Sequence, residues 1–243
     1  MIGRQREIAR LAELWQNAHA TGQAHWALVG GDAGMGKTTL VSAFVETVPE
    51  AAVLIGNCLP MGGEGIPYAP IVGWMPALIE RHGTDRVRDW AGQAGWETLG
   101  VLLPGVGAAR PDGAIERLRL SEAVTAVLER AAEQEPLLVV LEDLHWADTT
   151  TAQLARFLKS SLSRSPLVLL GTWRTDELHR RHPMRPWLAE VGRQPDVARF
   201  ELGPLSEQDA SRRPRSNPPS APNCSSAPRP SASTSPTSWP SSG

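Results

Sequence analysis

With 243 residues and a formal net charge of −2, the chain is long enough for one large domain and has no overall bias towards nucleic acid. Its two cysteines, Cys58 and Cys224, exclude a disulfide framework and a cysteine-based zinc site, and we expect Cys58 to be a small buried side chain. No segment has the apolar length of a membrane span or the character of a signal peptide, so we expect a cytoplasmic protein that does not enter membranes.

The first half of the chain alternates apolar segments with segments rich in glycine and proline. Ile8, Leu11 and Trp15 recur at helical spacing, which predicts an amphipathic helix. Short apolar runs predict buried strands, and clusters of glycine and proline predict loops. In chain order we expect a helix over residues 7–20, a strand over 25–30, a glycine-rich loop over 31–38 with a helix after it, a strand over 51–56, a loop over 59–70 and a helix over 71–81.

The second half continues the alternation after an ambiguous stretch over residues 82–113. Apolar spacing predicts a helix over residues 114–134, with its apolar face formed by Leu118, Val124, Val127 and Leu128. The continuous apolar run over 137–141 suits a parallel strand that is covered on both faces. We then expect a helix over 149–162, a strand over 167–173, a helix over 186–192 and a strand over 199–202.

Residues 31–38, GDAGMGKT, fit the phosphate-binding pattern G-x-x-x-x-G-K-[ST]. Glycines let backbone N–H groups turn towards phosphate oxygens, and the helix that follows adds its own unpaired N–H groups. Lys37 is suited to reach the β and γ phosphates, and the Thr38 hydroxyl is suited to ligate Mg²⁺. The alternative is a glycine-rich turn that binds nothing. We therefore expect a nucleotide to contact Gly31, Asp32, Ala33, Gly34, Met35, Gly36, Lys37, Thr38 and Thr39.

The apolar strand over residues 137–141 is followed by two acids, Glu142 and Asp143. Mg²⁺ prefers oxygen ligands, so one carboxylate is suited to hold the metal, and its neighbour is suited to polarise an attacking water as a general base. The first acid of this motif is usually Asp, and here it is Glu142, so the division of roles stays open. The alternative interpretation is that these two acids end a strand and bind no metal.

Arg174 follows the strand predicted over residues 167–173. The carboxyl ends of parallel strands face the ligand crevice in such folds, and a guanidinium there is suited to contact a γ-phosphate. The alternative is a surface arginine in a structural salt bridge.

Three histidines need a separate interpretation. For the segment His145-Trp146-Ala147-Asp148 we favour packing by Trp146 and a helix N-cap by Asp148, with His145 close to the site as the second possibility. His179 and His182 lie three residues apart without an acidic or cysteine partner, so we expect a solvated turn and no metal site.

Four segments together resemble a known family: residues 2–7, 31–39, 137–148 (LLVVLEDLHWAD) and 171–178 (GTWRTDEL). They resemble the ATPase domain of large bacterial LuxR-type transcriptional regulators, which belong to the STAND class of signal-transduction ATPases. The same AAA or Orc1-like ATPase domain also accompanies nucleotide cyclase domains and some kinases. The resemblance covers roughly residues 1–210 and implies a P-loop NTPase fold, a three-layer α/β sandwich with a mostly parallel sheet.

The resemblance also implies residue roles. Gly3 and Arg4 match a motif whose backbone lies against adenine, so the expected ligands are ATP or ADP with Mg²⁺. By this resemblance, the residues that act in hydrolysis are Lys37, Glu142, Asp143 and Arg174. The residues that hold Mg²⁺ are Thr38, Glu142 and Asp143. In this family ATP commonly acts as a switch that hydrolysis resets. Self-association, or docking on other domains of a parent regulator, is the expected partnership.

The resemblance stops at about residue 210. Residues 211–243 contain 11 Ser, 8 Pro, 4 Arg and no acid, a composition that predicts a disordered tail. The small helical domain that continues the family pattern, and the helix-turn-helix that binds DNA, are not recognisable in this chain. Arginine outnumbers lysine by 22 to 2, which indicates GC-rich coding DNA, so we hypothesise that the tail results from a frameshift. A genuine disordered linker is the alternative.

The leading functional interpretation is a domain that binds and hydrolyses Mg-ATP as the switch of a LuxR-type regulator. A nucleotide-binding interaction module without turnover is the second. The third is the ATPase portion of a cyclase-associated signalling protein, although no cyclase domain is recognisable here.

Overall fold

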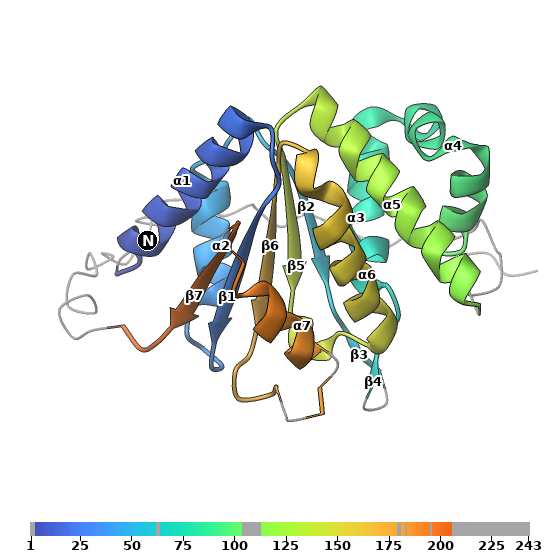
Figure 1. Cartoon of the computed structure of the whole chain (residues 1–243). Coiled ribbons are helices and arrows are strands. Elements are labelled where there is room, and N and C mark those ends of the chain that lie inside the picture. The colour runs from blue at the N-terminus through green and yellow to red at the C-terminus, as the bar shows by residue number, and fades with distance from the viewer. Residues whose placement is uncertain are drawn as a thin grey trace, which may run out of the picture. The chain divides into compact units, whose positions relative to one another are not determined.

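The computed structural model describes residues 3–61, 64–103, 113–178, 181–182, 184–194 and 196–205. Within these residues, five parallel strands form one sheet in the order β2-β5-β6-β1-β7. The strands are β1 (His25–Gly31), β2 (Ala52–Asn57), β5 (Leu137–Glu142), β6 (Leu167–Trp173) and β7 (Val197–Leu202). Their carboxyl ends gather at the lower edge of the sheet in Figure 1. This arrangement confirms the predicted α/β fold with a parallel sheet.

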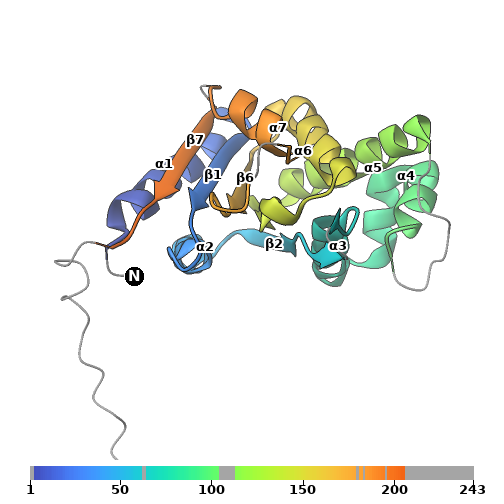
Figure 2. The ribbon, with the colours of Figure 1, turned by 90° about the horizontal axis from the view of Figure 1, so that it is seen from below.

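The sheet is covered on both faces. Successive side chains of β1 point to opposite faces, as in any strand. Trp26 and Leu28 enter one core cluster, whereas Ala27 and Val29 enter the other. Helices α1 (Gln5–Thr21) and α2 (Lys37–Val45) cover one face, and α5 (Ala114–Gln134), α6 (Thr149–Ser161) and α7 (Met184–Val191) cover the other (Figure 2). The result is the predicted three-layer sandwich.

Most helices and strands lie within one or two residues of the predicted bounds, and the differences fall in two segments. Residues 69–100 form α3 (Ala69–His82), which packs on β2, and α4 (Thr84–Gly100), which runs through the ambiguous stretch with a kink at Gly92 (φ 68°). The predicted loop over 59–70 contains a short hairpin of β3 (Pro60–Met61) and β4 (Glu64–Gly65).

One predicted core residue was wrong. Leu118 of α5 is 46% exposed, whereas Val124, Val127 and Leu128 are fully buried. The buried side chains of this helix begin at Leu120, so its first turns extend past the core. Helical spacing indicated the correct face of the helix but not the point along it where the core begins.

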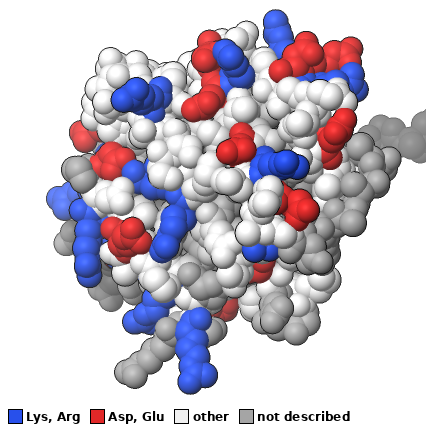
Figure 3. Space-filling view, turned by 45° about the vertical axis from the view of Figure 1, so that its right-hand side comes forward, with Lys and Arg blue, Asp and Glu red and all other residues white. Residues whose placement is uncertain are grey.

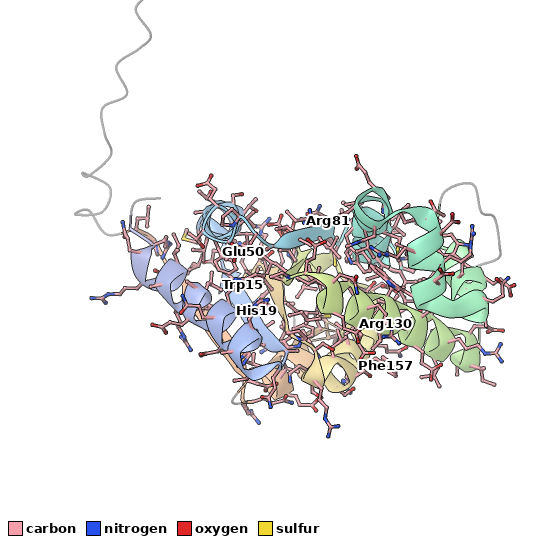
Figure 4. The ribbon with its side chains drawn as sticks, turned by 90° about the horizontal axis from the view of Figure 1, so that it is seen from above. Trp15, His19, Glu50, Arg81, Arg130 and Phe157 are labelled. Carbon is pink, nitrogen blue, oxygen red and sulfur yellow. The ribbon has the colours of Figure 1, made fainter. Side chains whose placement is uncertain are left out.

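Helix α1 also contacts the segment that leads into the amino end of β2. Trp15 Nε1 donates a hydrogen bond to Glu50 Oε1 at 3.1 Å, and the His19 ring donates from Nδ1 to the Trp15 carbonyl at 2.8 Å. Figure 4 shows the three labelled side chains close together. The bond from Trp15 to Glu50 joins α1 to the segment between α2 and β2, and the bond from His19 lies within α1.

None of the helices in the described part of the chain has the length and apolar character needed to cross a membrane. The predicted tail over residues 211–243 lies outside the described residues, so its disorder and its origin stay predictions.

Candidate functional site

The glycine-rich loop joins β1 to α2 at the carboxyl edge of the sheet. Gly34 (φ 77°) and Gly36 (φ 82°) adopt left-handed backbone conformations that side chains with a Cβ disfavour, which is the physical reason for glycine at both positions. A pocket of about 380 Å³ opens beside the loop. It is lined by Ala33, Gly34, Gly36, Lys37, Thr38, Thr39, Asp143 and Arg174.

Lys37 is a buried cation at the floor of this pocket. Its Nζ donates hydrogen bonds to the carbonyls of Gly31 (2.7 Å) and Asp32 (2.9 Å), and no carboxylate among the described residues forms an ion pair with it. Burial lowers the pKa of the Lys37 ammonium, and the charges of nearby acids oppose that effect. The site therefore holds a positive charge without a directly bonded counter-charge, which an anionic ligand would supply.

Thr38 connects the loop to the end of β5. Its side chain lies beside the carboxylate of Glu142, a residue that is only 9% exposed. Burial raises the pKa of the Glu142 carboxyl, and the adjacent charge of Asp143 adds to the rise, while the nearby Thr38 hydroxyl opposes it. A hydroxyl beside a carboxylate offers the hard oxygen ligands that Mg²⁺ requires, so these residues fit the metal.

Asp143 points differently from its neighbour. Its backbone is left-handed (φ 59°), a conformation that Asp tolerates better than most residues, and its N–H donates to Thr172 Oγ1 at 3.1 Å. Its carboxylate is 47% exposed and lines the pocket. The two acids thus separate: Glu142 faces Thr38, and Asp143 faces the space in which a ligand would lie.

His145 lies beside the pocket, against Asp143 and the backbone of Arg174, which agrees with the position near the site considered from the sequence. Its side chain is 2% exposed, and Nδ1 lies 3.8 Å from Asp143 Oδ1. Nδ1 accepts a hydrogen bond from the backbone N–H of Arg174 at 3.3 Å, and Nε2 lies 3.2 Å from Glu177 Oε2. Burial lowers the pKa of the imidazole despite the two nearby acids.

The favoured interpretation of the following residues was also correct. Trp146 packs against the core, and the Asp148 carboxylate accepts hydrogen bonds from the N–H groups of Thr150 and Thr151 as the N-cap of α6.

Arg174 lines the pocket from the carboxyl end of β6. Its guanidinium forms ion pairs with Asp176, at 2.8 Å from Nη2, and with Glu177 through Nη1. The salt bridges match the alternative interpretation drawn from the sequence, and the arginine also lines the pocket, whereas its contact with a γ-phosphate stays a prediction. On the molecular face shown in Figure 3, basic and acidic side chains are interspersed.

A further contact ties β6 to the phosphate loop. The Thr175 hydroxyl donates to Asp32 Oδ1 at 2.5 Å, and the Thr175 N–H reaches the Gly31 carbonyl at 3.4 Å. Sequence reasoning named neither Thr175 nor Glu177. The sequence indicated these two residues only by their position within three residues of Arg174, just after the end of a strand.

Gly3 and Arg4 lie on the outer side of the same loop. Arg4 is 6% exposed, and its Nη2 donates to the carbonyls of Met35 (3.2 Å) and Gly203 (2.5 Å), while Nη1 pairs with Glu7. The N-terminal segment is thereby fixed against the phosphate loop and the residue that follows β7. The adenine contact expected for Gly3 and Arg4 stays a prediction.

His182 corrects the expectation of a solvated turn. It is 6% exposed, donates from Nε2 to the His145 carbonyl at 2.7 Å, and accepts the Met184 N–H at Nδ1 at 3.2 Å. The segment that contains His182 packs against the turn after β5. The spacing of histidines along the sequence cannot predict such a tertiary contact. His179 lies outside the described residues.

A glycine loop that opens a helix, opposite two acids that end another strand of a parallel sheet, defines the P-loop class of nucleotide-binding proteins. Within that class, the family model described as "AAA ATPase domain" matches residues 1–170. The chain belongs to this family.

Other comparisons find distant relatives. A protein of Rhizobium meliloti (strain 1021), described as uncharacterized, is 26% identical over 196 residues, which is 72% of this chain and 18% of that protein. The chain thus spans less than a fifth of that relative's length. Among solved structures, the chain is similar to Cdc6p from Pyrobaculum aerophilum, with a TM-score of 0.43, 19% identity, and coverage of 81% of this chain and 45% of that one. It is also similar to Drosophila ORC bound to DNA, with a TM-score of 0.42, 15% identity, and coverage of 82% and 91%.

Proposed function

We propose that this domain binds Mg-ATP and hydrolyses it, and that the two nucleotide states form the switch of a LuxR-type transcriptional regulator. The observation that carries the first part is the buried Lys37 ammonium, which lacks an ion pair among the described residues and faces a pocket lined by Asp143 and Arg174. Membership of the AAA ATPase family supports nucleotide binding. The regulator role rests on the sequence resemblance.

Each residue has a proposed task. Lys37 and the loop N–H groups bind the phosphates, and Thr38 and Glu142 hold Mg²⁺. Asp143 orients and deprotonates the attacking water, because its carboxylate faces the pocket. Arg174 stabilises negative charge that develops on the transferred phosphoryl group. Bound Mg-ATP supplies the phosphoanhydride bond that is broken.

Hydrolysis and simple binding are separated by the Asp143→Asn variant. We expect Asp143→Asn to bind Mg-ATP in calorimetry and to release phosphate about 100-fold more slowly than the wild type, the scale of general-base catalysis. Asp89→Asn, which changes an exposed acid on α4, is the matched control and should match the wild type in both assays. If the wild type binds Mg-ATP and releases no phosphate, the domain is an interaction module without turnover and the hydrolytic part of the proposal is wrong.

The regulator part has a separate test in the coding DNA. Translation of the DNA beyond codon 200 in all three frames should show the small helical domain that continues the family pattern and later a helix-turn-helix. A downstream cyclase domain would instead support the cyclase-associated alternative.

A further inference from the structure

Glu177 connects two groups of the site that come from different strands. Its Oε2 lies 3.2 Å from His145 Nε2, and its Oε1 pairs with Arg174 Nη1. His145 follows β5 and Arg174 follows β6, so a single carboxylate links the ends of two neighbouring strands.

The hydrogen bonds of His145 determine where its proton lies. The backbone N–H of Arg174 can only donate, so His145 Nδ1, at 3.3 Å, must accept. The ring proton of the neutral imidazole is therefore on Nε2, the nitrogen that faces Glu177. One carboxylate oxygen lies 3.2 Å from the imidazole Nε2, and the other pairs with the guanidinium. The Nδ1 lone pair accepts from the Arg174 N–H, and Asp143 Oδ1 lies 3.8 Å from the same nitrogen.

The neighbouring residue Asp176 provides an internal comparison. It also pairs with the Arg174 guanidinium, at 2.8 Å from Nη2 and 3.4 Å from Nε. Among the described contacts, His145 pairs with Asp143 and Glu177 but not with Asp176. Both carboxylates therefore form ion pairs with Arg174, but of the two only Glu177 is paired with His145 among the described contacts.

We propose that Glu177 is a positioning residue that holds His145 in the Nε2–H tautomer and directs Arg174 towards the phosphate pocket. Its effect on turnover rests on the function proposed above, whereas its effect on the imidazole does not. Loss of Glu177 removes one contact from the imidazole and one from the guanidinium, while Asp176 still pairs with Arg174 and the Arg174 N–H still reaches His145. Loss of Asp176 leaves the imidazole and one arm of the guanidinium in place.

The test compares Glu177→Ala with Asp176→Ala in the full chain. Nitrogen-15 NMR of labelled histidine reports the tautomer of each ring, and the signals of His145 are identified by their absence from His145→Asn. We expect Glu177→Ala to shift the His145 signals away from the Nε2–H pattern, and Asp176→Ala to leave them as in the wild type. This measurement needs neither nucleotide nor turnover.

Steady-state kinetics provides the second readout. Glu177→Ala should lower kcat about 10- to 100-fold, the scale of a misplaced site group, while KM for Mg-ATP changes less than about twofold. Asp176→Ala should lower kcat less than about threefold. Glu177→Gln should retain part of the activity, since its amide oxygen still accepts from Nε2–H. This variant also replaces Glu177→Ala if the alanine variant fails to fold.

Unchanged His145 signals in the Glu177 variant overturn the proposal whatever the turnover. So does an unchanged kcat, or an equal loss of kcat in the Asp176 variant. If the wild type shows no turnover and Glu177→Ala still shifts the His145 signals, the hydrolytic function fails while the positioning of His145 stands.

Discussion

The Thr38 side chain lies beside the buried carboxylate of Glu142, so the phosphate loop and the end of β5 bring two hard oxygen ligands near each other. These residues lie 104 positions apart in the sequence. Thr38 is in the first turn of α2, which follows β1, Glu142 is the last residue of β5, and β6 lies between β1 and β5 in the sheet. The proximity of Thr38 and Glu142 gives the proposed Mg²⁺ site a defined place, because it sets the metal beside the loop that is proposed to bind the phosphates.

This proximity predicts the behaviour of Thr38→Ala. The variant should need a higher Mg²⁺ concentration for ATP hydrolysis, by about tenfold, because it loses one oxygen ligand. Thr38→Ser retains the hydroxyl and should resemble the wild type. Titration of phosphate release with Mg²⁺ checks this, and equal Mg²⁺ requirements of Thr38→Ala and the wild type would contradict it.

The backbone of the loop predicts a stability effect at Gly34. A methyl group on Gly34 would meet no atom within 4 Å, but φ of 77° is strained for alanine. Gly34→Ala should therefore lower the free energy of unfolding by about 1 kcal/mol, measured by urea denaturation. Gly34→Asn should cost less, since Asn tolerates the left-handed region. A loss in the alanine variant no larger than in the asparagine variant would show that backbone strain is not the cause.

The N-cap of α6 predicts a second stability effect. Asp148 accepts hydrogen bonds from two backbone N–H groups at 2.9 and 3.0 Å. Asp148→Ala should lower the free energy of unfolding by about 1 kcal/mol, and Asp148→Asn by clearly less, because the amide oxygen still accepts. Urea unfolding of both variants measures the difference, and an equal loss in the two would argue against capping.

The raised pKa of Glu142 predicts a dependence of stability on pH. A carboxyl whose pKa is raised by folding contributes stability below its unfolded value, near 4.5, and that contribution is lost as pH rises through the folded value. Without ligand, Glu142→Gln should therefore have a higher Tm than the wild type at pH 7, and the difference should shrink towards pH 4. Thermal unfolding measured across this range checks the sign. A lower Tm for Glu142→Gln at pH 7 would contradict it.

Local sequence signals were sufficient for much of the fold and for the residues proposed to contact the nucleotide. The helix predicted over 114–134 is α5, and the strand predicted over 167–173 is β6, because regular apolar spacing and glycine punctuation are short-range properties. The kinked α4 was missed because Gly92 interrupts its pattern without ending the helix.

Contacts between loops were beyond such reasoning. Glu177 meets His145, and His182 binds the His145 carbonyl, only because the chain after β6 folds over the turn after β5. Spacing along the chain carries no information about that path.

Steady-state phosphate release from Mg-ATP, by the wild type and by Lys37→Ala, tests the central claim most directly. Lys159→Ala, which changes the only other lysine of the chain, is the control. The account predicts release by the wild type and by Lys159→Ala, and loss of release in Lys37→Ala. Equal release by Lys37→Ala and the wild type would show that the phosphate loop does not carry the activity and would contradict the assignment.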